Sequence, residues 1–122
     1  MKFILVAAAI NGFLAVALGA FGAHGLEGKI SDKNLDIWGK AVNYQMFHTM
    51  ALFVTALLMS KIQSGLMTGA GWAFFIGIIL FSGSLYIYAP TSIKAFAMIT
   101  PLGGVAFLVG WILLGYAVIK HV

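Results

Sequence analysis

Apolar residues follow one another in four long runs that contain no Asp, Glu, Lys or Arg: 3–23, 45–60, 69–89 and 95–119. A helix of about 20 mostly apolar residues is long enough to cross the hydrocarbon core of a bilayer. Short links between such helices make neighbours antiparallel. The pattern predicts an all-α integral membrane protein, a single transmembrane domain over residues 1–122 folded as an up-down four-helix bundle. The expected helices are 3–23, 43–61, 69–89 and 95–119.

Between the first two runs lies the main aqueous segment, which holds all three acidic residues of the chain. Ser31 or Asp32 can cap a helix that begins near Lys33. Apolar and charged side chains of this helix fall on different faces, with Leu35, Trp38 and Val42 on one and Lys33, Asp36 and Lys40 on another. This pattern is typical of an amphipathic interfacial helix, continuous with or kinked into the second span.

The two prolines mark expected helix boundaries in the second half of the chain. A regular helix loses a hydrogen bond at proline, so the third helix is expected to end at Ala89 or Pro90. Thr100 and Pro101 suit the cap and first position of a helix, which offers a second start for the fourth helix besides Ala95.

Small residues recur on the first helix at spacings of four, three, four and three: Ala8, Gly12, Ala15, Gly19 and Gly22. Such a stripe lets another helix backbone approach closely. The stripe either packs the bundle internally or forms the face of a homo-oligomer. Asn11 lies beside it at mid-membrane and is expected to form an interhelical hydrogen bond. Gly103 and Gly104 are expected to allow similar close packing of the fourth helix.

Composition agrees with a membrane protein, since 62% of the residues are hydrophobic and only 8% are charged. The absence of cysteine excludes a disulfide framework and a thiolate zinc site. Seven lysines are scattered along the chain. They form no nucleic-acid patch, and the partner they indicate is the lipid bilayer through its headgroups. We expect a bacterial plasma-membrane protein with both termini cytoplasmic, because Lys29 and Lys33 on the other side are interleaved with acids.

Antiparallel helices bring several polar residues toward one leaflet: His24, Tyr44, Gln45, His48 and Thr100, together with Ser82, Ser84, Tyr86 and Tyr88. Tyr44 and His48 are four residues apart and share a helix face. The cluster has three interpretations: mutual hydrogen bonding between helices, a pocket for a small ligand or lipid headgroup, or metal or haem ligation by His24 and His48. Two histidines are too few for a closed zinc site, and we expect neither a metal nor a resident cofactor.

Charged groups are missing from all four runs, which counts against ion-coupled transport. The acids lie in the most exposed segment, and no hydroxyl has a recognisable base and acid around it. We therefore predict a non-enzymatic protein that is a structural, accessory or self-associating membrane subunit, as a homo-oligomer or part of a larger complex. The alternatives are a lipid, quinone or haem binding protein and a passive channel formed by a homo-oligomer.

Three blocks of sequence resemble the family named domain of unknown function 423. They are Leu18-Gly-Ala-Phe-Gly-Ala-His-Gly-Leu26, then Trp38 with Ala41, Tyr44-Gln45, His48 and Ala51-Leu52, and finally Thr100-Pro101-Leu-Gly-Gly104 with Gly110-Trp111. The resemblance implies a small four-span membrane protein, mainly bacterial with relatives in eukaryotes, and no established activity, substrate or cofactor. Within these motifs, the resemblance implies that the candidate functional residues are His24, Tyr44, Gln45, His48, Thr100 and Pro101.

Overall fold

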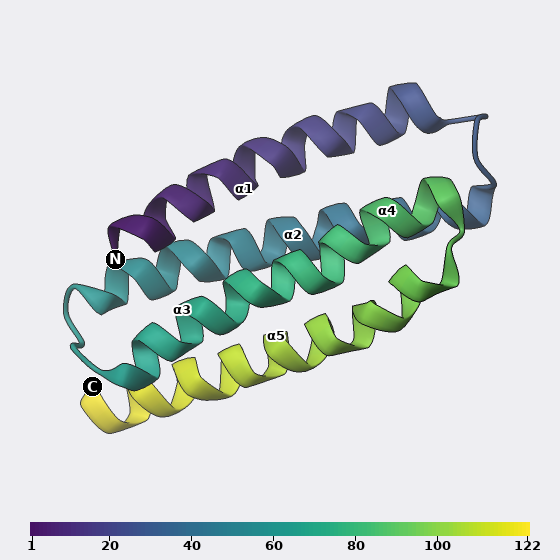
Figure 1. The fold of residues 1–122 in the computed structure, drawn as a ribbon. Coiled ribbons are helices and arrows are strands. Elements are labelled where there is room, and N and C mark those ends of the chain that lie inside the picture. Colours follow the sequence, from purple (N-terminus) through teal and green to yellow (C-terminus); the bar gives the residue numbers. More distant parts are fainter.

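The computed structural model describes residues 1–122 as four long helical rods with no strand (Figure 1). Its elements are α1 (Lys2–Phe21), the π-helical turn η1 (Gly22–Leu26), α2 (Asp32–Met59), α3 (Gly65–Ile78), the π-helical turn η2 (Ile79–Gly83), α4 (Ser84–Thr91) and α5 (Lys94–His121). Each rod is long and apolar enough to cross a membrane, the first being α1 with η1 and the third α3, η2 and α4. The rods alternate in direction, so both termini lie at one end. The predicted all-α, four-span architecture is confirmed.

Serine caps explain where the second and third rods begin. The Ser31 hydroxyl accepts the Asn34 backbone N–H at 3.1 Å, and α2 starts at the next residue. The amphipathic segment and the second span therefore form one helix. The Ser64 hydroxyl likewise accepts the backbone N–H of Leu66 at 3.1 Å. It starts the third rod at Gly65, earlier than the predicted residue 69.

Both prolines lie inside helices. Pro90 is in the last turn of α4, which ends at Thr91 before Ser92 adopts a left-handed conformation with φ of 57°. Pro101 lies well inside α5, so the alternative helix start at Thr100 is wrong. In lipid, an unwound segment before Thr100 would leave several backbone groups unpaired, which costs more than the one hydrogen bond lost at proline.

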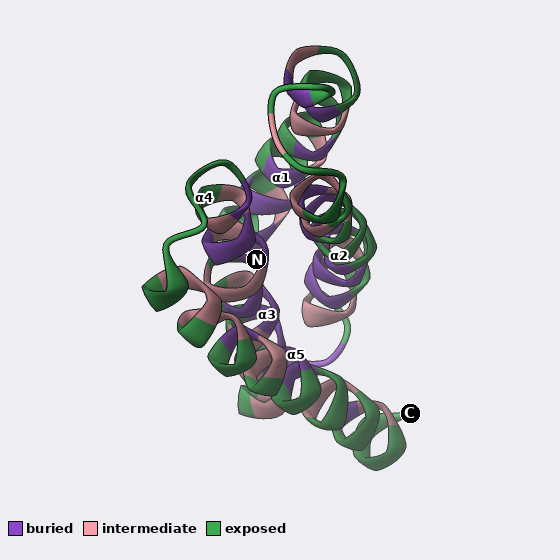
Figure 2. Cartoon of the chain, turned by 90° about the vertical axis from the view of Figure 1, so that its right-hand side faces the viewer, coloured by how far each residue is buried: buried purple, intermediate pink, exposed green.

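The rods pack in an open arrangement. The most extensive pairs are α1 with α2 and α3 with α5, and α2 with α3 joins the two pairs. α1 and α5 lie on opposite sides of the molecule (Figures 1 and 2) and have no substantial contact. The largest buried cluster lies between the rods and contains Ile4, Ala8, Ala51, Leu52, Ala56, Ala70, Phe74, Ile78 and Phe107. The outward side of α5 is largely exposed.

Glycines set the contact between the third and fourth rods. The Phe107 ring covers Gly77, and the Phe74 ring covers Gly110 in the reverse direction, so that a Cβ on either glycine would lie 2.5 Å or 2.7 Å from ring carbon. Gly103 meets the backbone of Phe81 itself. Larger residues at these positions would force the helices apart.

The stripe of small residues on α1 faces α2 of the same chain. Ala8 and Ala15 are buried, and a Cβ added at each glycine of the stripe would meet an α2 side chain: Thr49 for Gly12, Val42 for Gly19 and Trp38 for Gly22. Gly104 differs from the prediction, because no heavy atom lies within 4 Å of a Cβ built there. Its helix face turns away from α3, toward a groove rather than toward another helix.

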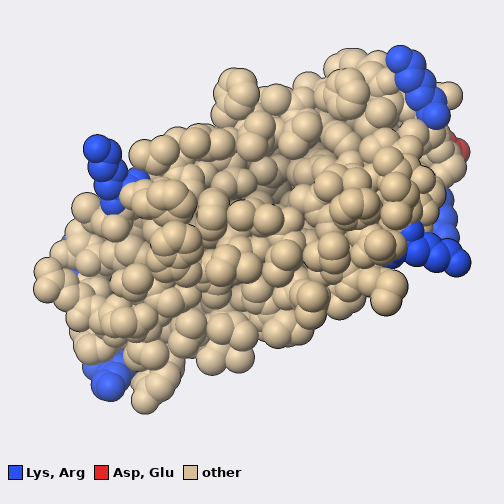
Figure 3. All heavy atoms as spheres, viewed as in Figure 1, with Lys and Arg blue, Asp and Glu red and all other residues tan.

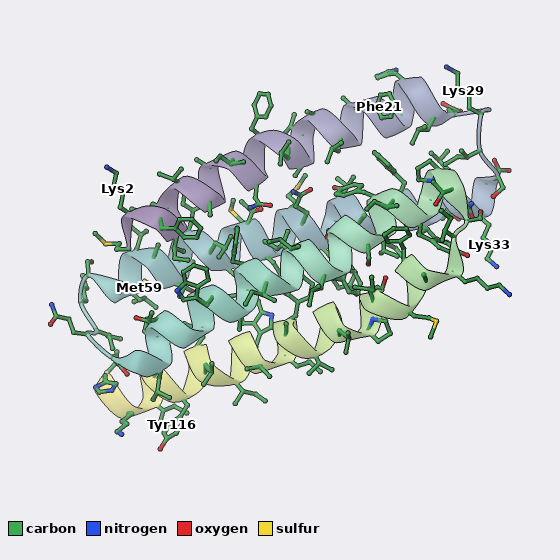
Figure 4. The ribbon with its side chains drawn as sticks, in the orientation of Figure 1. Lys2, Phe21, Lys29, Lys33, Met59 and Tyr116 are labelled. Carbon is green, nitrogen blue, oxygen red and sulfur yellow. The ribbon has the colours of Figure 1, made fainter.

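On the face shown in Figure 3, charged side chains lie at the two ends of the rods, with an uncharged band between them. Lys2 lies at the end with the termini, and Lys29 and Lys33 lie at the opposite end, near the loop between α1 and α2 (Figure 4). This distribution places the apolar band in the hydrocarbon and the lysines at the headgroups.

Candidate functional site

A groove of about 540 Å³ lies between α2 and α5. Its wall is mainly aromatic and aliphatic, built from Tyr44, Phe47 and His48 of α2, Phe81 of η2, and Pro101, Gly104, Val105, Phe107, Leu108 and Trp111 of α5. Helical spacing accounts for the two sides, because residues three and four apart share a face. Gly104 leaves room that a side chain would fill, which keeps the α5 wall recessed.

His48 forms the polar part of the groove wall. The Trp111 indole N–H donates to His48 Nε2 at 3.1 Å, and His48 Nδ1 lies 2.9 Å from the carbonyl oxygen of Tyr44. A nitrogen that accepts from an indole carries no proton, since the indole is only a donor. Nδ1 must then carry the proton and donate it to the carbonyl. The geometry assigns His48 the neutral Nδ1–H tautomer, with both ring nitrogens satisfied.

Aromatic rings surround this imidazole. Phe107 stacks on it with ring centroids 3.6 Å apart and planes 8° apart. Phe47 and Phe74 lie with centroids at 5.3 Å and 5.8 Å. Only 3% of His48 is exposed. These contacts hold the imidazole in one orientation between the neighbouring rings.

A second polar group joins three helices on the other side of α2. Gln45 Nε2 donates to Asn11 Oδ1 at 2.9 Å, and the Tyr86 hydroxyl donates to Gln45 Oε1 at 2.6 Å. Asn11 Nδ2 in turn donates to the Ala7 carbonyl at 2.8 Å. The interhelical hydrogen bond predicted for Asn11 is present. This chain of bonds ties α1, α2 and α4 together at the bottom of a smaller crevice of about 230 Å³.

Single hydrogen bonds fix the rods at other levels. Trp38 Nε1 donates to the Leu18 carbonyl at 2.8 Å, the Ser82 hydroxyl to the Ala41 carbonyl at 2.8 Å, and Asn34 Nδ2 to the Ala89 carbonyl at 2.9 Å. No buried side-chain nitrogen or oxygen is left without a partner. The polar groups of the interior thus stabilise the packing of the rods.

The predicted site residues are divided among several places. Tyr44 and His48 share the groove, whereas Gln45 points into the network on the opposite side of α2. The Thr100 hydroxyl lies 2.6 Å from the Ser84 hydroxyl of α4. His24 is exposed in η1 and does not line the groove, so the proposed pairing of His24 with His48 is wrong. An imidazole one turn beyond the end of α1 faces outward because the small face of that helix is occupied by α2.

Sequence reasoning did not assign Phe107 and Trp111 to the site. Phe107 belongs to none of the predicted sites, and Trp111 enters only with the Gly110-Trp111 pair of the third family block. The available signal was the spacing of Gly104, Phe107 and Trp111, three and four residues apart, which places both aromatic side chains on the helix face of the glycine. Their contact with His48 depends on the rotation of α5 about its axis, which the periodicity of one helix does not determine.

The groove is suited to bind an apolar molecule. Tyr44 is 45% exposed, and its hydroxyl has no hydrogen bond within the chain, which leaves a polar group beside the aromatic wall. No three His, Asp or Glu side chains converge in a way that would hold a metal ion.

Comparison with known proteins agrees with this membrane architecture. Residues 18–104 match the family described as "Protein of unknown function (DUF423)". The chain is 54% identical over 122 residues to UPF0382 membrane protein YwdK of Bacillus subtilis, covering 99% of each protein. It is 51% identical over 120 residues to UPF0382 membrane protein SAB0533 of Staphylococcus aureus, covering 98% of each. No solved structure matches the chain. The chain belongs to the DUF423 family of membrane proteins.

Proposed function

We propose that this protein is a non-enzymatic membrane protein that holds a hydrophobic molecule of the bilayer in the groove between α2 and α5. The observation that carries the proposal is the recessed aromatic wall around His48, at the depth of the uncharged band. Concave, mostly apolar surfaces with few polar groups are typical of small-molecule sites. The unpaired Tyr44 hydroxyl supplies such a polar group.

The groove opens toward lipid rather than toward water. Phe47 is 61% exposed, Val105 57% and Leu108 64%, and all three line the groove. These residues lie within the apolar runs 45–60 and 95–119, which contain no charged side chain. A molecule dissolved in the bilayer can reach the groove from the side, without crossing a polar surface.

The contacts of His48 favour a binding wall over a catalytic or haem-ligating role. Coordination of iron through Nε2 requires displacement of the Trp111 N–H, and Nδ1 is held by the Tyr44 carbonyl. A second axial imidazole is lacking in the groove, because His24 lies elsewhere. The contacts of His48 therefore disfavour haem as the ligand, whereas a lipid or a quinone fits the groove without displacing them.

The proposal includes a bacterial plasma membrane and cytoplasmic termini. The end that carries Lys2, Lys61 and Lys120 contains no Asp or Glu side chain, whereas all three acids lie at the opposite end. An unopposed basic surface fits the anionic cytoplasmic leaflet. Labelling of single cysteines placed at the two ends with an impermeant reagent in intact cells tests this orientation.

Native mass spectrometry of purified protein tests the binding proposal. We expect a hydrophobic molecule to remain bound through a mild detergent and to be lost in Gly104→Leu, because the added side chain fills the groove. Gly115→Leu is the matched control, since Gly115 also has open space beyond its Cβ but does not line the groove. Equal retention by both variants and the unmodified protein would refute binding in the groove.

Self-association, alone or in a larger complex, is a second candidate function. It is favoured by Gly104 and Gly115, which leave open space on the outward side of α5 and are eleven residues apart, hence on nearly the same face. Small residues on a lipid-facing helix allow close contact with another helix. Crosslinking in a bilayer tests this candidate: a dimer that Gly115→Leu abolishes would support it, and a monomer in every variant would refute it.

A further inference from the structure

We propose that the groove between α2 and α5 binds an anionic phospholipid, whose acyl chain lies on the aromatic wall and whose phosphate contacts Lys40 and Lys94. The inference rests on the proposed function and specifies its ligand. It is argued from the position of these two lysines relative to the groove, which gives the site a charged end as well as an apolar one.

Lys40 marks the charged end on α2. It lies four residues before Tyr44, one helical turn or about 6 Å toward the loop end. At about 100° per residue, Lys40 falls between the directions of Tyr44 and Phe47, which both line the groove. Lys40 is exposed, so its ammonium group can reach the headgroup level above the aromatic wall.

Lys94 is the lysine on α5 beyond the same end of the groove, nearer the loop end than Lys40. It lies seven residues before Pro101, on the same side of the helix and about 10 Å nearer the loop end. Pro101 is the groove residue closest to this end of α5. Lys94 is also exposed. The two helices that form the groove therefore each carry a lysine beyond the same end of it.

The surrounding charges leave this end basic. On the groove face of α2, Lys33 precedes Lys40 by two turns and Asp36 lies between them. With Lys94, three lysines oppose one carboxylate on the groove side, and the whole end carries four lysines and three acids. An anionic headgroup is attracted to such a surface, whereas an additional cationic group is repelled.

The length of the site selects a molecule with a head and a tail. His48 lies about 12 Å deeper than Lys40, and Trp111 about 25 Å along α5 from Lys94. Because His48 and Trp111 are hydrogen-bonded to each other, Lys40 lies deeper than Lys94, and its side chain extends toward the loop end to reach the same anionic group. A molecule that contacts the lysines and the deep aromatic rings needs an anionic group joined to a long apolar chain. A quinone has no anionic group for the lysines. A second copy would bring four lysines and three acids to this end, a surface of the same net sign.

Tryptophan fluorescence offers a direct test, because Trp111 lines the groove. The Trp72→Phe protein, which keeps Trp111 and the buried Trp38, is reconstituted in phosphatidylcholine vesicles. The vesicles contain equal small fractions of either dibrominated phosphatidylglycerol or dibrominated phosphatidylcholine. The Trp72→Phe/Trp111→Phe protein gives the Trp38 signal to be subtracted. We expect the anionic lipid to quench Trp111 at a lower mole fraction than the zwitterionic lipid.

Lysine variants locate the headgroup. Lys40→Gln and Lys94→Gln should each lower the relative association of the anionic lipid about fivefold, the usual contribution of one lysine near a headgroup. Lys61→Gln and Lys120→Gln make the same charge change at the other end of the rods and should leave the preference unchanged. Circular dichroism and gel filtration verify folding, which exposed substitutions of this kind preserve.

The outcomes separate this inference from the proposed function. Equal quenching by both lipids, reduced for both by Gly104→Leu, would keep the groove as a hydrophobic site and overturn the anionic ligand. Quenching that Gly104→Leu does not alter would overturn both. A preference that survives loss of Lys40 and Lys94, or that falls equally with Lys61→Gln, would also overturn the assignment of the headgroup.

Discussion

Gly103→Ala is the substitution expected to disrupt this fold most strongly for its size. A Cβ at this position would overlap the backbone nitrogen of Phe81 and lie 2.7 Å from the Phe81 Cα and Cβ. Most other crowded glycines meet the ends of side chains, which can rotate. Phe81 lies inside η2, where the backbone is held by helical hydrogen bonds on both sides. The added methyl group must therefore push α5 away from the third rod.

The size of the effect follows from the displacement. Restoring a carbon contact from 2.7 Å to an optimal distance of about 3.5 Å requires the helices to separate by about 0.8 Å. A gap of about 0.5 to 1 Å forfeits a quarter to a half of the dispersion energy of the atoms that face it. The rings of Phe74 and Phe107, each seated on a glycine of the opposite helix, lie in this interface. We expect a loss of about 2 to 3 kcal/mol in unfolding free energy, the upper part of the usual range for overpacking.

Reversible unfolding in mixed micelles, titrated with a denaturing detergent and followed by circular dichroism, measures this loss. Gly104→Ala is the matched control, because the neighbouring glycine of the same helix has no heavy atom within 4 Å of its Cβ. Gly104→Ala should leave stability unchanged or raise it by up to about 1 kcal/mol through helix propensity. If both variants were equally stable, the contact of Gly103 with Phe81 would not hold the two rods at this separation.

Further predictions concern the hydrogen bonds and a second crowded glycine, Gly22. Gln45→Leu leaves its two side-chain partners unpaired and should cost about 1 to 3 kcal/mol, at roughly 0.6 to 1.7 kcal/mol per bond in a membrane protein; unchanged unfolding would contradict the three-helix network. Nitrogen NMR of labelled histidine should show His48 as the neutral Nδ1–H tautomer, and an Nε2–H signal would exclude the hydrogen bond from Trp111. Gly22→Ala places a methyl group 2.5 Å from the Trp38 indole and should shift its emission to longer wavelength, whereas Gly39→Ala, with open space at its Cβ, should not.

The four spans were predictable because their determinants are local. Runs of apolar residues and a capping serine at Ser31 specify helix positions without knowledge of neighbours. The position of Pro101 inside a helix was harder to predict. It depends on whether the hydrogen bond lost at proline costs less free energy than backbone groups left unpaired in lipid. The lipid environment decides that comparison in favour of a continuous helix.

The site was only partly predictable because it depends on how each helix is rotated. Alternating direction correctly brought Gln45 and Tyr86 to one level, and Asn11 was correctly expected to need a partner. The same reasoning grouped His24 with His48, although η1 presents His24 to the exterior. Trp111 was placed in no predicted site, and its bond to His48 depends on how α5 is rotated against its neighbours. The depth of a residue in the membrane follows from its position in the sequence. The direction in which its side chain points around the helix follows from packing.

The pairing of α1 with α2 and of α3 with α5 has a consequence for biosynthesis. Each pair is a hairpin of consecutive spans, so the amino-terminal half can assemble before the carboxyl-terminal half has left the ribosome. The two halves are then joined by the buried cluster between the rods and by several hydrogen bonds, among them Tyr86 to Gln45 and Ser82 to the Ala41 carbonyl. A gene cut in the loop between Met59 and Gly65 should therefore yield two fragments that find each other within the bilayer.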